Sequence, residues 1–252
     1  MRATLFVIPG SHPSMAGRLM LEHKGIDYRR IDLVPSVHRA VVRAAGFPGM
    51  TVPALRLDGQ RLQGTRTISR ALDALRPDPP LFPREPERRQ AVERAEAWGD
   101  EVLQPVPRRL IWAVLKRHRP SIASFLEGSR LGIPTPLAVR SAAPVVALSA
   151  RLNRVSDEQI RADLEALPGM LGRVDEWIEL GVLGGPERNA ADFQIATSVR
   201  LLMCLDDVRP VIEGRSAGRL ATEVVPRFPG HAPRVLPPSW LEPLQRPVPA
   251  PA

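Results

Sequence analysis

A proline-rich segment near the end of the first third of the chain constrains the fold most. Residues 76–87, RPDPPLFPREPE, hold five prolines in twelve positions. Proline fixes φ and lacks a backbone donor, so this segment cannot continue a regular helix or a central strand. Apolar residues follow strand and helix periods before the segment and only helix periods after it. The sequence therefore predicts two domains joined by a linker.

The domain boundaries follow from this change of pattern. We expect an α/β domain, a proline-rich linker, an all-helical domain and a proline-rich extended tail, over residues 1–77, 78–87, 88–228 and 229–252. Nine of the 27 residues from Pro226 onward are prolines, so the tail is expected to be extended and either draped over the surface or partly disordered.

The first domain shows the order β-α-β-α-β-β-α. Its first two strands should be parallel because a helix crosses between them. Asp58-Gly59 between two alternating runs is a strong hairpin signal. Strands are expected at residues 3–8 and 28–33 and on both sides of this turn, and helices at 13–24, from a Ser36 cap to about 45, and from Thr65 onward.

The second domain shows helical periods throughout. Ser156 is expected to cap one helix, and Asn189 with Asp192 should form a capping box at the start of another. The expected helices cover residues 88–116, 137–152, 156–180 and 189–205.

Composition limits the function classes. The net charge is +8, but the basic residues are almost all arginines that alternate with acids, so we expect no nucleic-acid partner. No apolar stretch approaches the roughly 20 residues of a membrane helix, and we expect a cytoplasmic protein. Cys204 is the only cysteine, which excludes an internal disulfide and a cysteine-rich zinc site, and we expect no metal site. In its apolar run, Cys204 should be a buried and inert thiol.

Four segments, in this order along the chain, resemble motifs of the glutathione transferase superfamily. They are IPGSHPSMAGRLML, MTVPAL, QGTRTISRAL and NAADFQIA. The resemblance implies a thioredoxin-like N-terminal domain followed by a helical domain, and the habit of forming homodimers. It also implies an enzyme that activates glutathione, or a related small thiol, for attack on an apolar electrophile.

Ser11 is the catalytic residue that the resemblance implies, because it precedes a helix that starts with proline. A thiol with a pKa near 8.5 is mostly protonated at neutral pH, and the thiolate is the nucleophile. A hydroxyl donor at a helix N-terminus would stabilise that thiolate. The alternative is that Ser11 only caps the helix, which is the favoured role for Ser14. His12 is expected to be a solvated loop residue rather than a base or ligand.

Val52 and Pro53 are the implied site for the cysteinyl backbone of the thiol. In the family this proline is cis, and the preceding residue offers its amide and carbonyl to the thiol like an added strand. The alternative is an ordinary trans proline at the entrance of a strand.

Two departures from the family pattern affect the rest of the thiol site. Thr65 keeps a hydroxyl for the γ-glutamyl carboxylate, but Gly64 replaces the acidic or amide residue that would pair with the ammonium group. Met50 stands where serine-type relatives often have a histidine for the glycine carboxylate. The thiol would then be held weakly, be held by Gln63 or Arg66, or be a different thiol.

The electrophile site should lie between the domains. Leu110, Trp112 and Leu115, and the segment 118–137, are candidates, although such residues are also typical of a core. The alternative function is a non-catalytic protein of the same fold that binds apolar ligands or a protein partner. The sequence names neither the electrophile nor the reaction type.

Overall fold

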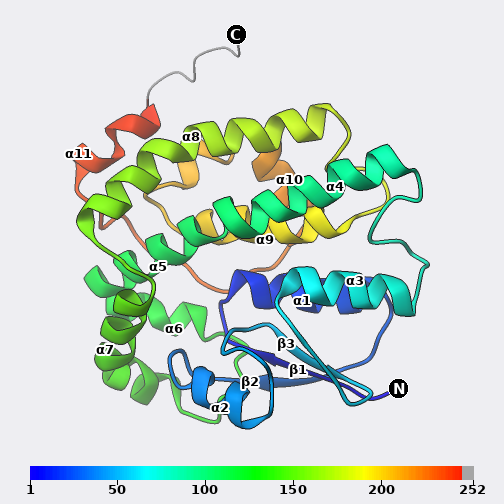
Figure 1. Ribbon diagram of the computed structural model, residues 1–252. Coiled ribbons are helices and arrows are strands. Elements are labelled where there is room, and N and C mark those ends of the chain that lie inside the picture. The colour runs from blue at the N-terminus through cyan, green and yellow to red at the C-terminus, as the bar shows by residue number, and fades with distance from the viewer. Residues whose placement is uncertain (246–252) are drawn as a thin grey trace.

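The computed structural model describes residues 1–245, which form a small sheet, a middle layer of two helices and a helical domain above it (Figure 1). The sheet has the order β2-β1-β3-β4, with β1 parallel to β2 and antiparallel to β3, and β4 antiparallel to β3. The strands are β1 Ala3–Val7, β2 Arg29–Asp32, β3 Ala54–Leu57 and β4 Gln60–Gln63. The predicted α/β-plus-helical fold class is confirmed.

Alternation along β1 places its side chains on two separate cores. Leu5 and Val7 pack on the face covered by α1 (His12–His23) and α3 (Thr65–Leu75). Phe6 lies on the other face, against Phe47 and α2 (His38–Ala44). Figure 1 shows α1 and α3 between the sheet and the helical domain, with α2 on the far side of the sheet. The sheet thus holds α1 at the boundary between the domains.

The predicted hairpin is present, but the predicted cap of α2 is wrong. Asp58 and Gly59 both have positive φ, 44° and 90°, as a two-residue turn between twisted strands requires. Helix α2 begins at His38 without a side-chain cap. Ser36 instead has a φ of 68°, and its hydroxyl lies 2.9 Å from that of Ser149 in the helical domain. This contact between the domains competes with capping for the same hydroxyl.

The helical domain contains the predicted helices with one interruption, and three further helices are present in the described part of the chain. The expected helix over residues 88–116 is broken by a π-helical turn, in which Gly99 packs against α9. A Cβ at Gly99 would lie 2.8 Å from Ile195 Cγ1. The helix at residues 216–224 was not expected, nor were the short helices at residues 122–125 and 238–241. The segments are α4 Pro86–Trp98, the π turn Gly99–Leu103, α5 Pro105–Arg117, α6 Ile122–Phe125, α7 Thr135–Leu152, α8 Asp157–Glu179, α9 Ala190–Leu202, α10 Ser216–Val224 and α11 Pro238–Leu241, with 3₁₀ turns at Arg119–Ser121, Arg209–Val211 and Glu242–Gln245.

Helix α9 is the centre of the molecule and is buried along almost its whole length. It contacts α1 of the first domain and α4, α5 and α10 of its own. The predicted capping box is present: Asn189 Oδ1 accepts from the amides of Ala191 and Asp192, and the Asp192 carboxylate accepts from the Asn189 amide. The second Asp192 oxygen accepts from the Gly184 amide at 2.7 Å. The box therefore also fixes the loop that leads into α9.

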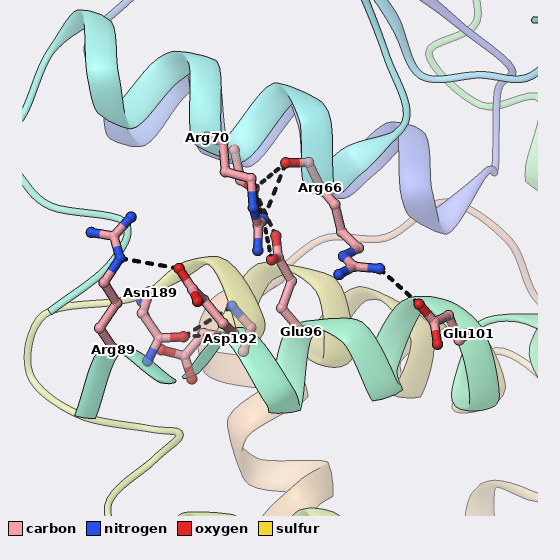
Figure 2. Close-up of polar contacts among 10 residues, drawn as sticks. Arg66, Arg70, Arg89, Glu96, Glu101, Asn189 and Asp192 are labelled. Atoms are coloured by element: carbon pink, nitrogen blue, oxygen red, sulfur yellow. Dashed lines mark hydrogen bonds and ion pairs between the residues drawn. The ribbon is translucent and has the colours of Figure 1, made fainter. Parts of the chain in front are cut away.

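Polar contacts join the two domains beside α9. Glu96 of α4 is buried and accepts hydrogen bonds from Ser69 and Arg70 of α3, while Arg66 pairs with the exposed Glu101 (Figure 2). Burial raises the pKa of Glu96, and the hydrogen bonds from Ser69 and Arg70 lower it by a smaller amount. The interface thus depends on a buried carboxylate that needs its two donors.

Lys24 anchors the linker to the first domain. Its side chain is fully buried, and Nζ donates to Asp73 Oδ1 and to the carbonyls of Arg76 and Pro79. All three ammonium protons therefore have acceptors, as a buried charge requires.

The described part of the tail lies against the helical domain and contains the short helix α11. The isolated bridge between Leu205 and Ala232 docks its first part, and Leu236 and Leu244 are buried. The guanidinium groups of Arg117 and Arg161 both lie over the ring of Trp240 in α11. Apolar residues between the prolines find partners on the helical domain, which fixes this segment. The expected tail beyond residue 245 lies outside the described residues.

We expect Asp192→Ala to lower the free energy of unfolding by about 2–4 kcal/mol, because the amides of Asn189 and Gly184 lose their acceptor. Asp157→Ala is the matched control, since Asp157 is an exposed acid in the first turn of α8 and should cost about 0.5 kcal/mol or less. Urea unfolding measures both. Equal costs for the two variants would contradict the buried role of Asp192.

A second prediction concerns pH and Glu96. Because its folded pKa is raised, the unfolded chain releases this proton at a lower pH than the folded protein does. The stability contribution of Glu96 is therefore fully present below its unfolded pKa, about 4.3, and is lost as the pH rises through the folded pKa. In urea unfolding at a series of pH values, the stability of wild type relative to Glu96→Gln should fall across this window. Glu101→Gln is the control. If the stability of wild type relative to Glu101→Gln fell across the same pH window, the assignment of this pH dependence to Glu96 would be wrong.

Candidate functional site

A cleft of about 350 Å³ lies between the two domains. The loop after β1 and the start of α1 form one wall, together with residues 50–52 before β3. Helix α5 and the segments around α6 and the end of α7 form the opposite wall. Both walls therefore depend on how α1 and α5 pack against α9.

Ser11 lines this cleft at the N-cap of α1. Its backbone is extended, and Pro13 follows in the first turn. The Ser11 hydroxyl oxygen accepts from the Ser14 amide at 3.4 Å, and the Ser11 amide donates to the Ile8 carbonyl. A hydroxyl has one donor and two acceptor lone pairs, so capping uses only an acceptor. Within the described residues, the Ser11 proton remains available for a ligand.

Ser14 is not among the residues that line this cleft. It is buried, and its hydroxyl oxygen accepts from the Ile8 amide at the end of β1. Ser14 therefore stabilises the strand-to-helix loop, and of the two serines Ser11 is the one that lines the cleft.

His12 is not the solvated loop residue that was expected. It is buried, and its Nε2 lies 3.2 Å from the carbonyl oxygen of Gln104, just before α5. Burial lowers the pKa of His12 well below its usual range, and the charge of Arg108 lowers it further. His12 thus joins the domains as a neutral imidazole, because α1 packs directly beneath the helical domain.

The Val52–Pro53 peptide bond is cis, the geometry that the resemblance implies. Val52 lines the cleft together with Met50, Thr51 and Ser11. A Cβ on Gly17 of α1 would lie 3.2 Å from Pro53 Cβ, so α1 approaches this loop closely. The structure therefore brings Ser11 and Val52 to one cleft.

Thr65 lies at the first position of α3, after Gly64 with a φ of 83°. The Thr65 hydroxyl is buried and has no hydrogen-bond partner among residues 1–245. It is not part of the cleft wall that holds Ser11 and Val52. Its position at a helix N-terminus suits a carboxylate, but Gly64 offers no side chain for an ammonium group.

Gln63 and Arg66, the two substitutes proposed from the sequence, are already engaged. Gln63 Oε1 accepts from the Gly49 amide and Nε2 donates to the Thr51 carbonyl, so the side chain fixes the loop before Val52. Arg66 pairs with Glu101 across the domain interface (Figure 2). Neither residue lines the cleft, and both stabilise the structure around it.

The wall formed by α5 carries some of the residues expected there and two others. Trp112 and Leu115 line the cleft as expected, whereas Leu110 is fully buried away from it. Arg108 and Ile111 also line it and were missed. The spacing 108, 111, 112 and 115 places these side chains on one helix face, which is the signal that could have identified Arg108.

Metal chemistry and thiol chemistry of the chain itself find no support in the described part of the chain. No group of three potential ligands that could hold a metal ion occurs there. Burial raises the pKa of Cys204 to about 11, so this thiol is an unreactive core residue. No helix among residues 1–245 could span a membrane.

Comparisons with known proteins agree with this architecture. Residues 5–80 match the family model of the glutathione S-transferase N-terminal domain. No curated protein sequence matches the chain.

Solved structures similar to the chain cover nearly all of it. FzlA from C. crescentus is 17% identical with a TM-score of 0.58, over 96% of this chain and 99% of that one. Beta-etherase LigF from Sphingobium sp. strain SYK-6 is 18% identical with a TM-score of 0.59, over 88% and 99%. A glutathione S-transferase from Methylobacterium radiotolerans, solved with glutathione sulfonate, is 18% identical with a TM-score of 0.53, over 94% and 99%. Residues 5–80 are thus similar to the glutathione S-transferase N-terminal domain, and the chain as a whole shares the fold of these solved structures.

Proposed function

We infer that this protein is a glutathione transferase-like enzyme that activates glutathione, or a related small thiol, for attack on an apolar electrophile. The observation that carries this proposal is the position of Ser11 and Val52 on one cleft, with the Ser11 proton available. A sulfur held over the start of α1 would accept a hydrogen bond from Ser11 while the Val52 backbone holds the cysteinyl unit. The structure solved with glutathione sulfonate is a neighbour in fold, which supports this ligand class.

The energies are sufficient for this role. Lowering a thiol pKa from about 8.5 by two units requires about 2.7 kcal/mol of selective thiolate stabilisation. A hydrogen bond to a charged group contributes about 1.5–3 kcal/mol, and a helix N-terminus adds about 0.3–1 kcal/mol. Ser11 and α1 together supply this amount without another catalytic group.

The remaining thiol contacts are fewer than the family pattern implies. Thr65 is the proposed partner of the γ-glutamyl carboxylate, because its buried hydroxyl lacks a protein partner at the start of α3. Gln63 and Arg66 are proposed to position the loop and the interface rather than to contact the thiol. We therefore expect weak thiol affinity, and thiols smaller than glutathione are reasonable alternatives. The proposal includes a cytoplasmic homodimer, on the resemblance alone, which light scattering of the purified protein would check for oligomeric state.

We expect Ser11→Ala to raise the apparent pKa of the bound thiol by about one to two units, because the thiolate loses its hydroxyl donor. The measurement is the pH–rate profile of glutathione conjugation to 1-chloro-2,4-dinitrobenzene. At neutral pH the rate should fall about ten- to a hundred-fold, and the loss should shrink as the pH approaches the raised pKa. Ser11→Thr, which keeps a hydroxyl, should restore part of the shift.

Ser14→Ala is the matched control, since its hydroxyl accepts from Ile8 and does not line the cleft. It should lower the free energy of unfolding by about 1 kcal/mol and leave the thiol pKa in place. A shifted profile in Ser14→Ala and an unchanged one in Ser11→Ala would show that the activating group is misassigned. A wild-type protein without any thiol-dependent rate would instead favour the non-catalytic binding protein.

A further inference from the structure

The cleft carries positive charge without acidic neighbours. Two arginines line it, Arg39 of α2 and Arg108 of α5, and no aspartate or glutamate among the described residues does so. The other two titratable groups of its wall are histidines. Burial lowers the pKa of both His12 and His38, so at neutral pH these rings are uncharged. The charge of the cleft therefore comes from its arginines.

Arg108 lacks a partner within residues 1–245. It makes no hydrogen bond or ion pair there, and the charge of Asp100 acts on it only from a distance. The adjacent Arg109 differs, because its Nε and Nη2 bind both oxygens of Asp163 at 2.6 Å. A partly buried guanidinium without an acceptor is costly, and the planar group is suited to a carboxylate. Of the two neighbours, only Arg108 is left for a ligand.

The residues around Arg108 indicate what the part of the ligand beyond its acidic group would be. Ile111, Trp112 and Leu115 follow it on the same face of α5, and Phe125 of α6 completes an apolar wall. A flat aromatic body would pack against Trp112 and Phe125 while its acidic group reaches Arg108. Ser11 lies on the opposite wall of the same cleft.

We propose that the second ligand of this cleft is an amphipathic aromatic anion whose carboxylate binds Arg108 and whose ring packs on Trp112 and Phe125. This deepens the proposed function, on which it rests for the ligand's role as the electrophile. The binding itself does not depend on thiol chemistry. The preferred substrate class is then an apolar aromatic electrophile that also carries a carboxylate.

The test compares two nearly isosteric probes, 2-naphthoate and 2-naphthamide, by isothermal titration calorimetry at neutral pH and low ionic strength. Wild type should bind the carboxylate at least tenfold tighter than the amide. Arg108→Met should abolish this preference and leave the affinity for the amide unchanged, which also shows that the variant is folded. Lys116→Met removes one charge from an exposed position of α5 outside the cleft and should keep the preference.

Each other result overturns the inference. Equal affinities of wild type for the two probes, or binding of neither, would exclude a carboxylate site without any variant. A preference that survives Arg108→Met, or that disappears only in Arg39→Met, would remove Arg108 from this role. Loss of glutathione affinity in Arg108→Met with an intact preference for naphthoate would assign Arg108 to the thiol instead.

The test separates this inference from the proposed function. A tenfold preference for naphthoate in a protein without thiol-dependent activity would support the anion site and refute the transferase. Thiol-dependent activity with equal affinities for the two probes would support the transferase and refute the anion site.

Discussion

The buried carboxylate of Asp192 is the constraint on which the architecture depends. It closes the N-terminus of α9 and holds the preceding loop through the Gly184 amide. Burial raises its pKa, so an ionised Asp192 persists only because backbone amides from two directions offset the loss of water. Because α9 contacts α1 as well as its own domain, an error in its start would move both walls of the cleft.

The cleft results from the way in which α1 and α5 pack against α9. Helix α1 lies on one side of it and α5 on another, so the loop before α1 and one face of α5 meet across a gap. Polar contacts cross the domain interface: His12 with Gln104, Ser36 with Ser149, and Glu96 with Arg70. Such directional contacts fix the relative position of Ser11 and Arg108 more closely than apolar packing alone.

The sequence predicts most of this fold because local signals carry it. The linker prolines, the Asp58-Gly59 turn and the Asn189–Asp192 box each act through neighbouring backbone, so their effects can be read from short segments. The features that were not predicted depend on contacts between residues far apart in the sequence. Ser36, His12 and the π turn at Gly99 are decided by residues distant in sequence, Ser149, Gln104 and Ile195. No local pattern contains those partners.

The same distinction between local and long-range contacts explains which residues of the site could be predicted. Ser11 could be identified because a helix start defines its surroundings, and Val52 because a motif precedes β3. Arg108 is one arginine among many, and composition treats it as part of a scattered surface charge. Its neighbour Arg109 finds a carboxylate, whereas Arg108 faces a cleft wall without one. An arginine-rich chain can pair most of its guanidinium groups on the surface and still use one of them for recognition. What singles out that one is that no acid among the described residues pairs with it or lines the cleft beside it, which only the tertiary structure determines.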